Sequence, residues 1–158
     1  MKKTIFLTSL TTLISISVYA QFDLPIELTE QFYNVIQVDS MDMDQDGDVD
    51  LLATSNCKLF WYRNTSGTFE PEQQIIYEDS ICTINQTVFG DIDNDGDVDI
   101  TIVKKQAPSY DFFIYTLDNL GGGNFGPLVT ASSSFDGSNG PFIQLGDIDN
   151  DGNADILE

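Results

Sequence analysis

Three nine-residue stretches of this sequence have an aspartate at every second position, except that the third has an asparagine, Asn153, at position 7. The stretches read DMDQDGDVD at 42–50, DIDNDGDVD at 91–99 and DIDNDGNAD at 147–155. Carboxylates held a few ångströms apart repel one another and resist ionising together. Since 14 of the 26 acidic residues lie in these 27 positions, the negative charge is concentrated in the three stretches. Each stretch is therefore expected to bind a cation.

The spacing of the acids suits calcium. This ion takes six to eight oxygen ligands at about 2.3–2.6 Å, and a loop with acids at alternate positions can wrap around it. Side chains at positions 1, 3, 5 and 9 can supply oxygens, a glycine at position 6 allows a sharp turn, and position 7 can offer its carbonyl. We therefore predict up to three calcium ions, with site residues Asp42, Asp44, Asp46, Asp48, Asp50, Asp91, Asp93, Asp95, Asp97, Asp99, Asp147, Asp149, Asp151, Asn153 and Asp155.

Other interpretations of the loops fit less well. Magnesium prefers a small octahedral shell and keeps its waters, and zinc lacks its usual nitrogen and sulfur ligands here. Solvated acidic turns do not account for the same spacing in three copies. An EF-hand or dockerin-like module would place helices beside the loops. Only the third loop has the acid that an EF-hand needs at position 12, Glu158, where the other two have Ala53 and Ile102.

The segments around the loops repeat as well. Short runs rich in β-branched and aromatic residues, such as YNVIQV before the first loop and ITIVKK after the second, predict strands. The loops start 49 and 56 residues apart, and four short strands in about 50 residues make one β-propeller blade. We expect an all-β chain of four-stranded antiparallel blades in an incomplete propeller: blade one at about 32–80, blade two at about 81–131 and a partial blade three at about 140–158.

The first twenty residues have the pattern of a secretory signal peptide. Lys2 and Lys3 precede a short apolar stretch, and Val18-Tyr19-Ala20 supplies a cleavage site. The stretch is too short and too rich in Ser and Thr to span a bilayer. We expect a signal peptide at 1–20 and a propeller fragment at 21–158, secreted and located outside the cell or at its surface.

Charge and composition narrow the function. Beyond residue 20 the chain holds four basic and 26 acidic residues, a net charge of −22, which argues against nucleic acid as a partner. The absence of histidine removes Ser-His-Asp and Cys-His catalysis and imidazole zinc sites from this sequence. We expect a non-enzymatic protein without a membrane span in the mature chain, whose partner is an extracellular protein or carbohydrate that the sequence does not identify.

These motifs resemble the FG-GAP or VCBS repeat family, the calcium-bearing blades of integrin α-chain-like propellers. The resemblance rests on DMDQDGDVDLL, LFWYRNTSGTFEPEQQII, VFGDIDNDGDVDI and LGDIDNDGNADIL, which follow in order along the chain. It implies a calcium loop between the first and second strands of each blade and a role in adhesion or other extracellular binding. The alternative is an accessory propeller of a secreted carbohydrate-active enzyme. Met41 departs from the pattern, because glycine precedes the other two loops.

The propeller interpretation also bears on the cysteines and the aromatic runs. It places Cys57 in the turn between the second and third strands and Cys82 in the crossing to the next blade. These positions share a face, so a disulfide between the two residues is compatible with a secreted chain, with reduced thiols as the alternative. The aromatic runs at 60–62 and 112–115 could stack on carbohydrate, but we favour packing between blades.

Overall fold

The computed structural model of the chain describes residues 34–70, 74–81, 83–108, 111–132 and 140–158. These residues form strands, turns and irregular segments without any helix, and every strand pairing among them is antiparallel. The all-β fold expected from the sequence is confirmed. In this part of the chain no helix has the length and apolar character needed to cross a membrane. The predicted signal peptide and Cys82 lie outside the described residues.

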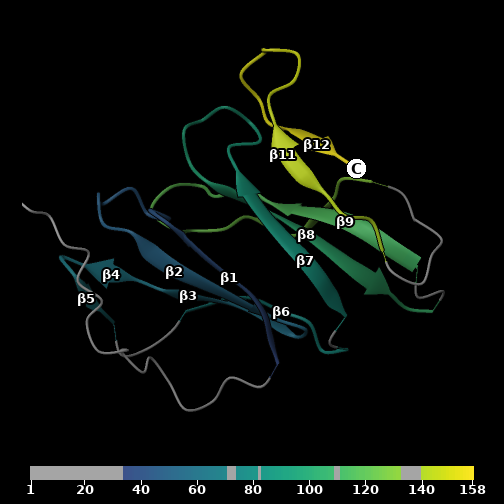
Figure 1. The fold of residues 1–158 in the computed structure, drawn as a ribbon, viewed down its shortest axis with the longest axis horizontal. Coiled ribbons are helices and arrows are strands. Elements are labelled where there is room, and N and C mark those ends of the chain that lie inside the picture. Colours follow the sequence, from purple (N-terminus) through teal and green to yellow (C-terminus); the bar gives the residue numbers. More distant parts are fainter. Residues whose placement is uncertain (1–33, 71–73, 82, 109–110, 133–139) are drawn as a thin grey trace, which may run out of the picture.

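Two four-stranded sheets make up most of the structure (Figure 1). The first has the order β1 (Val35–Met41), β2 (Asp50–Ser55), β3 (Lys58–Tyr62) and β6 (Gln74–Glu78). A separate small hairpin, β4 (Asn64–Thr65) and β5 (Thr68–Phe69), stands between β3 and β6 in the sequence. The second sheet has the same order, with β7 (Ile84–Gly90), β8 (Asp99–Gln106), β9 (Asp111–Leu117) and β10 (Val129–Thr130).

A third sheet is begun by the pair β11 (Gln144–Gly146) and β12 (Asp155–Leu157). Four strands that pair largely in chain order are the pattern of a propeller blade. The described strands do not close into a ring, so the number of blades in a propeller stays a prediction, as do the predicted domain boundaries.

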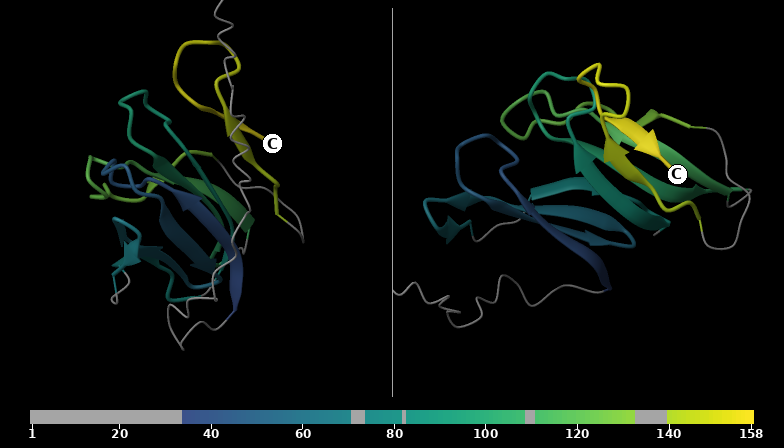
Figure 2. Two further views of the ribbon diagram at one scale, coloured as in Figure 1. Left: turned by 60° about the vertical axis from the view of Figure 1, so that its left-hand side comes forward. Right: turned by 45° about the horizontal axis from the view of Figure 1, so that its top comes forward.

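Each acidic stretch joins the first two strands of its sheet, and we call 42–50 loop 1, 91–99 loop 2 and 147–155 loop 3. The ninth residue of each loop is also the first residue of the following strand, where it pairs with the residue that precedes the loop: Met41 with Asp50, Gly90 with Asp99, and Gly146 with Asp155. The loops therefore project from the same end of their sheets and stand in a row on one side of the molecule (Figures 1 and 2).

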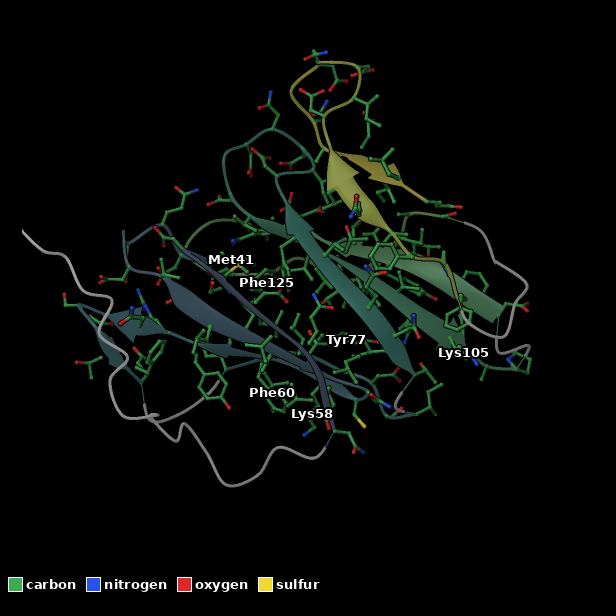
Figure 3. All side chains as sticks on the ribbon, in the orientation of Figure 1. Met41, Lys58, Phe60, Tyr77, Lys105 and Phe125 are labelled. Carbon is green, nitrogen blue, oxygen red and sulfur yellow. The ribbon has the colours of Figure 1, made fainter. Side chains whose placement is uncertain are left out.

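The main core lies between the first and second sheets. Its buried side chains are Met43, Leu52, Leu59, Trp61, Ile84, Ile100, Ile102 and Leu117. Met41, Tyr77 and Phe125 pack against them from β1, β6 and the segment after β9 (Figure 3). Because side chains alternate along a strand, β8 turns Ile102 toward this core and Val103 toward a second cluster with Ile143. The second sheet is thus covered on both faces.

Glutamine side chains of β1 and β7 bind the backbone of the next unit, in β7 and just before β11. The Gln37 amide donates from Nε2 to the Thr87 carbonyl at 2.8 Å and accepts the Thr87 N–H at 3.4 Å. Gln86 does the same with Ile143, at 2.9 and 3.1 Å. Both glutamines stand five positions before their loops, and both partners stand four positions before the next loop. The same contact therefore repeats from sheet to sheet.

Candidate metal centres

Three aspartates of each loop bring carboxylate oxygens within 4.8 Å of one another. They occupy positions 1, 3 and 9, and the groups are Asp42, Asp44 and Asp50 in loop 1, Asp91, Asp93 and Asp99 in loop 2, and Asp147, Asp149 and Asp155 in loop 3. The acids expected at positions 5 and 7, which are Asp46, Asp48, Asp95, Asp97 and Asp151, and Asn153 with them, are outside these groups. Their part in binding a metal stays a prediction.

Backbone hydrogen bonds to the carboxylates shape each loop. In loop 2, Asp91 accepts the N–H groups of Asp95 and Gly96, at 3.2 and 3.0 Å, and Asp95 accepts the N–H of Asp97 at 2.9 Å. Loops 1 and 3 have the same bonds. The glycine at position 6 has φ near +95° in all three loops, at 94°, 94° and 97°. A side chain would strain that conformation, so glycine is required there.

The aspartate at position 9 anchors the loop to the rest of its sheet. Asp50 and Asp99 are fully buried. Asp50 accepts the N–H of Met43 at 3.2 Å and of Asn64 at 2.7 Å. Asp99 accepts the N–H of Ile92 at 2.7 Å and of Asn119 at 2.8 Å. One carboxylate thus holds the start of the loop against the turn that follows the third strand, and Asp155 repeats the first of these bonds with Ile148.

The two asparagines, Asn64 and Asn119, are loop-anchoring positions that we did not predict from the sequence. Each is the second residue after the aromatic third strand, and each also donates from its side chain to the carbonyl at position 8 of its own loop, Val49 at 2.9 Å or Val98 at 3.3 Å. The recurrence of Asn at the same place in both units, in YRN and LDN, is the signal that could have identified them. Their contacts depend on the register of the second and third strands.

The electrostatics of the loops favour a bound cation. Burial raises the pKa of Asp99 against the opposing effect of its two backbone hydrogen bonds, and the nearby carboxylates of Asp93 and Asp118 raise it further. Desolvation and then the neighbouring carboxylate of Asp95 raise the pKa of Asp93. Carboxylates with raised pKa values in a cluster of oxygen donors gain most from a hard divalent cation. The three carboxylate groups could therefore hold a metal ion.

The family comparison agrees with this geometry. Residues 42–102 match the family model described as an FG-GAP-like repeat. Within this segment the chain is similar to an FG-GAP-like repeat. No match was found among curated proteins or among solved structures.

The matched FG-GAP-like repeat runs from loop 1 through loop 2 and into β8, so it contains two of the three carboxylate groups. Loop 3 lies outside the match but has the same spacing at positions 1, 3, 5, 6 and 9, the same backbone bonds within the loop and the first of the two anchoring bonds. All three loops are flanked by strands. The EF-hand alternative, which needs flanking helices, is therefore wrong.

The aromatic residues of the third strands are buried. Phe60, Trp61, Tyr62, Phe112 and Tyr115 are each at most 7% exposed. The predicted packing between sheets is confirmed for Trp61, in the main core, and for Phe112, in the cluster with Ile143. Phe60 and Tyr62 instead cluster with Ala53 of their own sheet. Trp61 packs tightly on Gly123, where a Cβ atom would lie 2.3 Å from the indole ring.

One cysteine of the predicted pair lies within the described residues. Cys57 stands between β2 and β3, as expected, and it is disulfide-bonded. Cys82, the other cysteine of the chain, is outside the described residues. The pairing of Cys57 with Cys82 stays a prediction.

Proposed function

We propose that the chain is a secreted, calcium-binding repeat protein that acts as a non-enzymatic scaffold in extracellular or cell-surface binding. The observation that carries the proposal is the threefold recurrence of one carboxylate group, at positions 1, 3 and 9 of each loop. The predicted signal peptide and the FG-GAP-like repeat at 42–102 support the location and the binding role.

Calcium would act on the structure of the loops. In loop 2 it would be held by Asp91, Asp93 and Asp99, and it would supply the positive charge that these carboxylates lack. Since Asp99 also binds the N–H groups of Ile92 and Asn119, an ion there would fix the loop to the turn after β9. The row of loops would then form one rigid edge of the scaffold.

Calcium titration by calorimetry, with far-UV circular dichroism on the same sample, tests the proposal. We expect two or three calcium equivalents and a β-type spectrum. Asp93→Ala removes an exposed member of the loop 2 group and should abolish one equivalent, because the site loses one of its three gathered carboxylates.

Glu78→Ala is the matched control for this experiment. It removes one negative charge from β6, where Glu78 pairs with Lys58 at 3.1 Å, and it should leave the stoichiometry unchanged. If the unaltered chain bound no calcium at millimolar concentration, the proposed function would be wrong. If Asp93→Ala kept every equivalent, the assignment of loop 2 would fail.

A further inference from the structure

The residue before each anchoring asparagine differs in charge between the two complete sheets. Asn64 donates its N–H to Asp50, and Asn119 donates its N–H to Asp99, so the two asparagines occupy equivalent places. The preceding residue is Arg63 in the first sheet and Asp118 in the second. A cation therefore stands beside loop 1 at the place where loop 2 has an additional carboxylate.

Arg63 makes direct contact with the loop 1 group. Its Nη2 atom lies 2.5 Å from Asp44 Oδ2 and 3.7 Å from Asp46 Oδ2. The Asp44 side chain is only 1% exposed, whereas Asp93, its counterpart in loop 2, is exposed. Asp44 belongs to the group with Asp42 and Asp50, and its Oδ1 atom already accepts the Asp46 N–H at 3.2 Å. The guanidinium therefore contacts the other carboxylate oxygen of a proposed metal ligand.

Loop 2 has the opposite environment. The ion pairs found among the described residues include none with a loop 2 carboxylate. Asp118 stands at the position equivalent to that of Arg63, because the next residue, Asn119, donates its N–H to Asp99 at 2.8 Å. Each of the two loops has five aspartates. Counting Asp118, the charge around loop 2 is −6, and counting Arg63, the charge around loop 1 is −4.

We propose that Arg63 is the built-in counterion of loop 1 in the metal-free protein, so that loop 1 is the weak calcium site and loop 2, reinforced by Asp118, is the tight one. This inference rests on the proposed function, since it concerns the relative affinities of two of its calcium sites. The two sites load at different calcium concentrations. Loop 2 fills first, and loop 1 fills only when calcium displaces the Arg63 guanidinium from Asp44.

The size of the difference follows from charge. A unit charge a few ångströms from a divalent ion in an exposed site changes the affinity by about tenfold, and ligand charge is one of the variables that sets calcium affinity in proteins. The sites differ by two units of charge at the equivalent position. We expect dissociation constants that differ by about a hundredfold at low salt, and by less at high salt, where exposed charges are screened.

Calorimetric calcium titrations of the full chain in single-site backgrounds test the assignment. The variant Asp93→Ala with Asp149→Ala leaves loop 1 intact, and Asp44→Ala with Asp149→Ala leaves loop 2 intact. In the first background, Arg63→Gln should lower the dissociation constant for calcium about tenfold and Arg63→Asp about a hundredfold. Arg63→Lys should change the dissociation constant little. In the second background, Asp118→Asn should raise the dissociation constant for calcium about tenfold and Asp118→Arg about a hundredfold.

The sign of the Arg63 effect separates this proposal from a structural role. Loss of a side chain that merely supported the loop would weaken calcium binding, whereas loss of a competing cation strengthens it. Circular dichroism of each variant is the control that tests whether the variant is folded. Equal affinities in the two backgrounds, or weaker binding by Arg63→Gln, would overturn the proposal while leaving the proposed function intact. Absence of calcium binding in both backgrounds and in the unaltered chain would overturn both.

Discussion

At the scale of single residues, Lys104 on β8 shows how a charge is accommodated between the two sheets. Its Nζ atom donates to the Tyr77 hydroxyl at 2.7 Å and to Asp79 Oδ2 at 3.4 Å, and it lies 5.5 Å from the centre of the Tyr115 ring. The Lys104 side chain is 13% exposed and that of Asp79 is 3% exposed. Breaking such a pair leaves the partner charge buried without compensation, which costs more than the pair itself contributes.

We therefore predict that Lys104→Met lowers the free energy of unfolding by about 3 kcal/mol, measured by urea denaturation. Lys105→Met is the matched control. Lys105 is the next residue on β8 and lies over the Phe112 ring at 4.9 Å, and its loss should cost less than about 1 kcal/mol. Equal losses in the two variants would contradict the role given to the Asp79 pair.

The same pair predicts a pH dependence. Burial alone would raise the pKa of Asp79, but the hydrogen bonds from Thr83 and Ile81 and the Lys104 ammonium hold it below its ordinary value. A lowered pKa in the folded state contributes stability above the unfolded pKa of about 3.9, and that stability is lost as the pH falls through the folded value. Urea midpoints between pH 6 and pH 2 should fall less steeply in Asp79→Asn than in the unaltered chain. Parallel curves would contradict the assignment.

At the scale of elements, the sequence predicted what is periodic and local. The alternating acids, the glycine at position 6 and the short β-branched runs identified the three loops and the strands beside them, because each signal lies within a few residues of its effect. What was missed depends on register and on neighbouring sheets. The position of Arg63 over loop 1, the anchoring by Asn64 and Asn119 and the contacts of Gln37 and Gln86 arise only when separate hairpins pack together.

Asn119 illustrates this dependence between elements, and it yields a prediction. It is 1% exposed, and its Nδ2 atom donates both to Val98 O in its own loop and to Met43 O in loop 1, at 3.3 and 3.0 Å. Asn64 makes the first kind of contact, to Val49 O, and its hydrogen bonds among the described residues stay within its own unit. A buried carbonyl that loses its donor costs about 1–3 kcal/mol.

In the calcium-free chain, Asn119→Ala should therefore lower the free energy of unfolding by about 2–3 kcal/mol, and Asn64→Ala by about 1 kcal/mol, as measured by urea denaturation. Hydrogen exchange locates the effect, because only Asn119→Ala should reduce amide protection in both loop 1 and loop 2. If Asn64→Ala disturbed both loops to the same extent, the link between the sheets would not pass through Asn119.

At the scale of the whole molecule, the negative charge is concentrated at one edge, because 14 of the 26 acidic residues lie in the three loops. The three loops, which carry 14 aspartates, stand in a row on the same side of the sheets (Figure 2), and their carboxylates repel one another as long as no cation is bound. Three calcium ions would change the net charge of residues 21–158 from −22 to −16. The whole change in charge would take place at the edge that the loops form. Folding and calcium binding are therefore expected to be linked.

We predict that calcium raises the melting temperature of the chain and that the increase continues with calcium concentration. A ligand at 100 times its dissociation constant stabilises the folded state by about 2.7 kcal/mol per site, so two filled sites would contribute about 5 kcal/mol. Differential scanning calorimetry in calcium and in chelator measures the shift. The triple variant Asp44→Ala, Asp93→Ala and Asp149→Ala is the control, since it removes one member of every carboxylate group, and its melting temperature should be the same in both buffers. A calcium-dependent shift of equal size in this variant would mean that the stabilising ions bind elsewhere on the acidic surface.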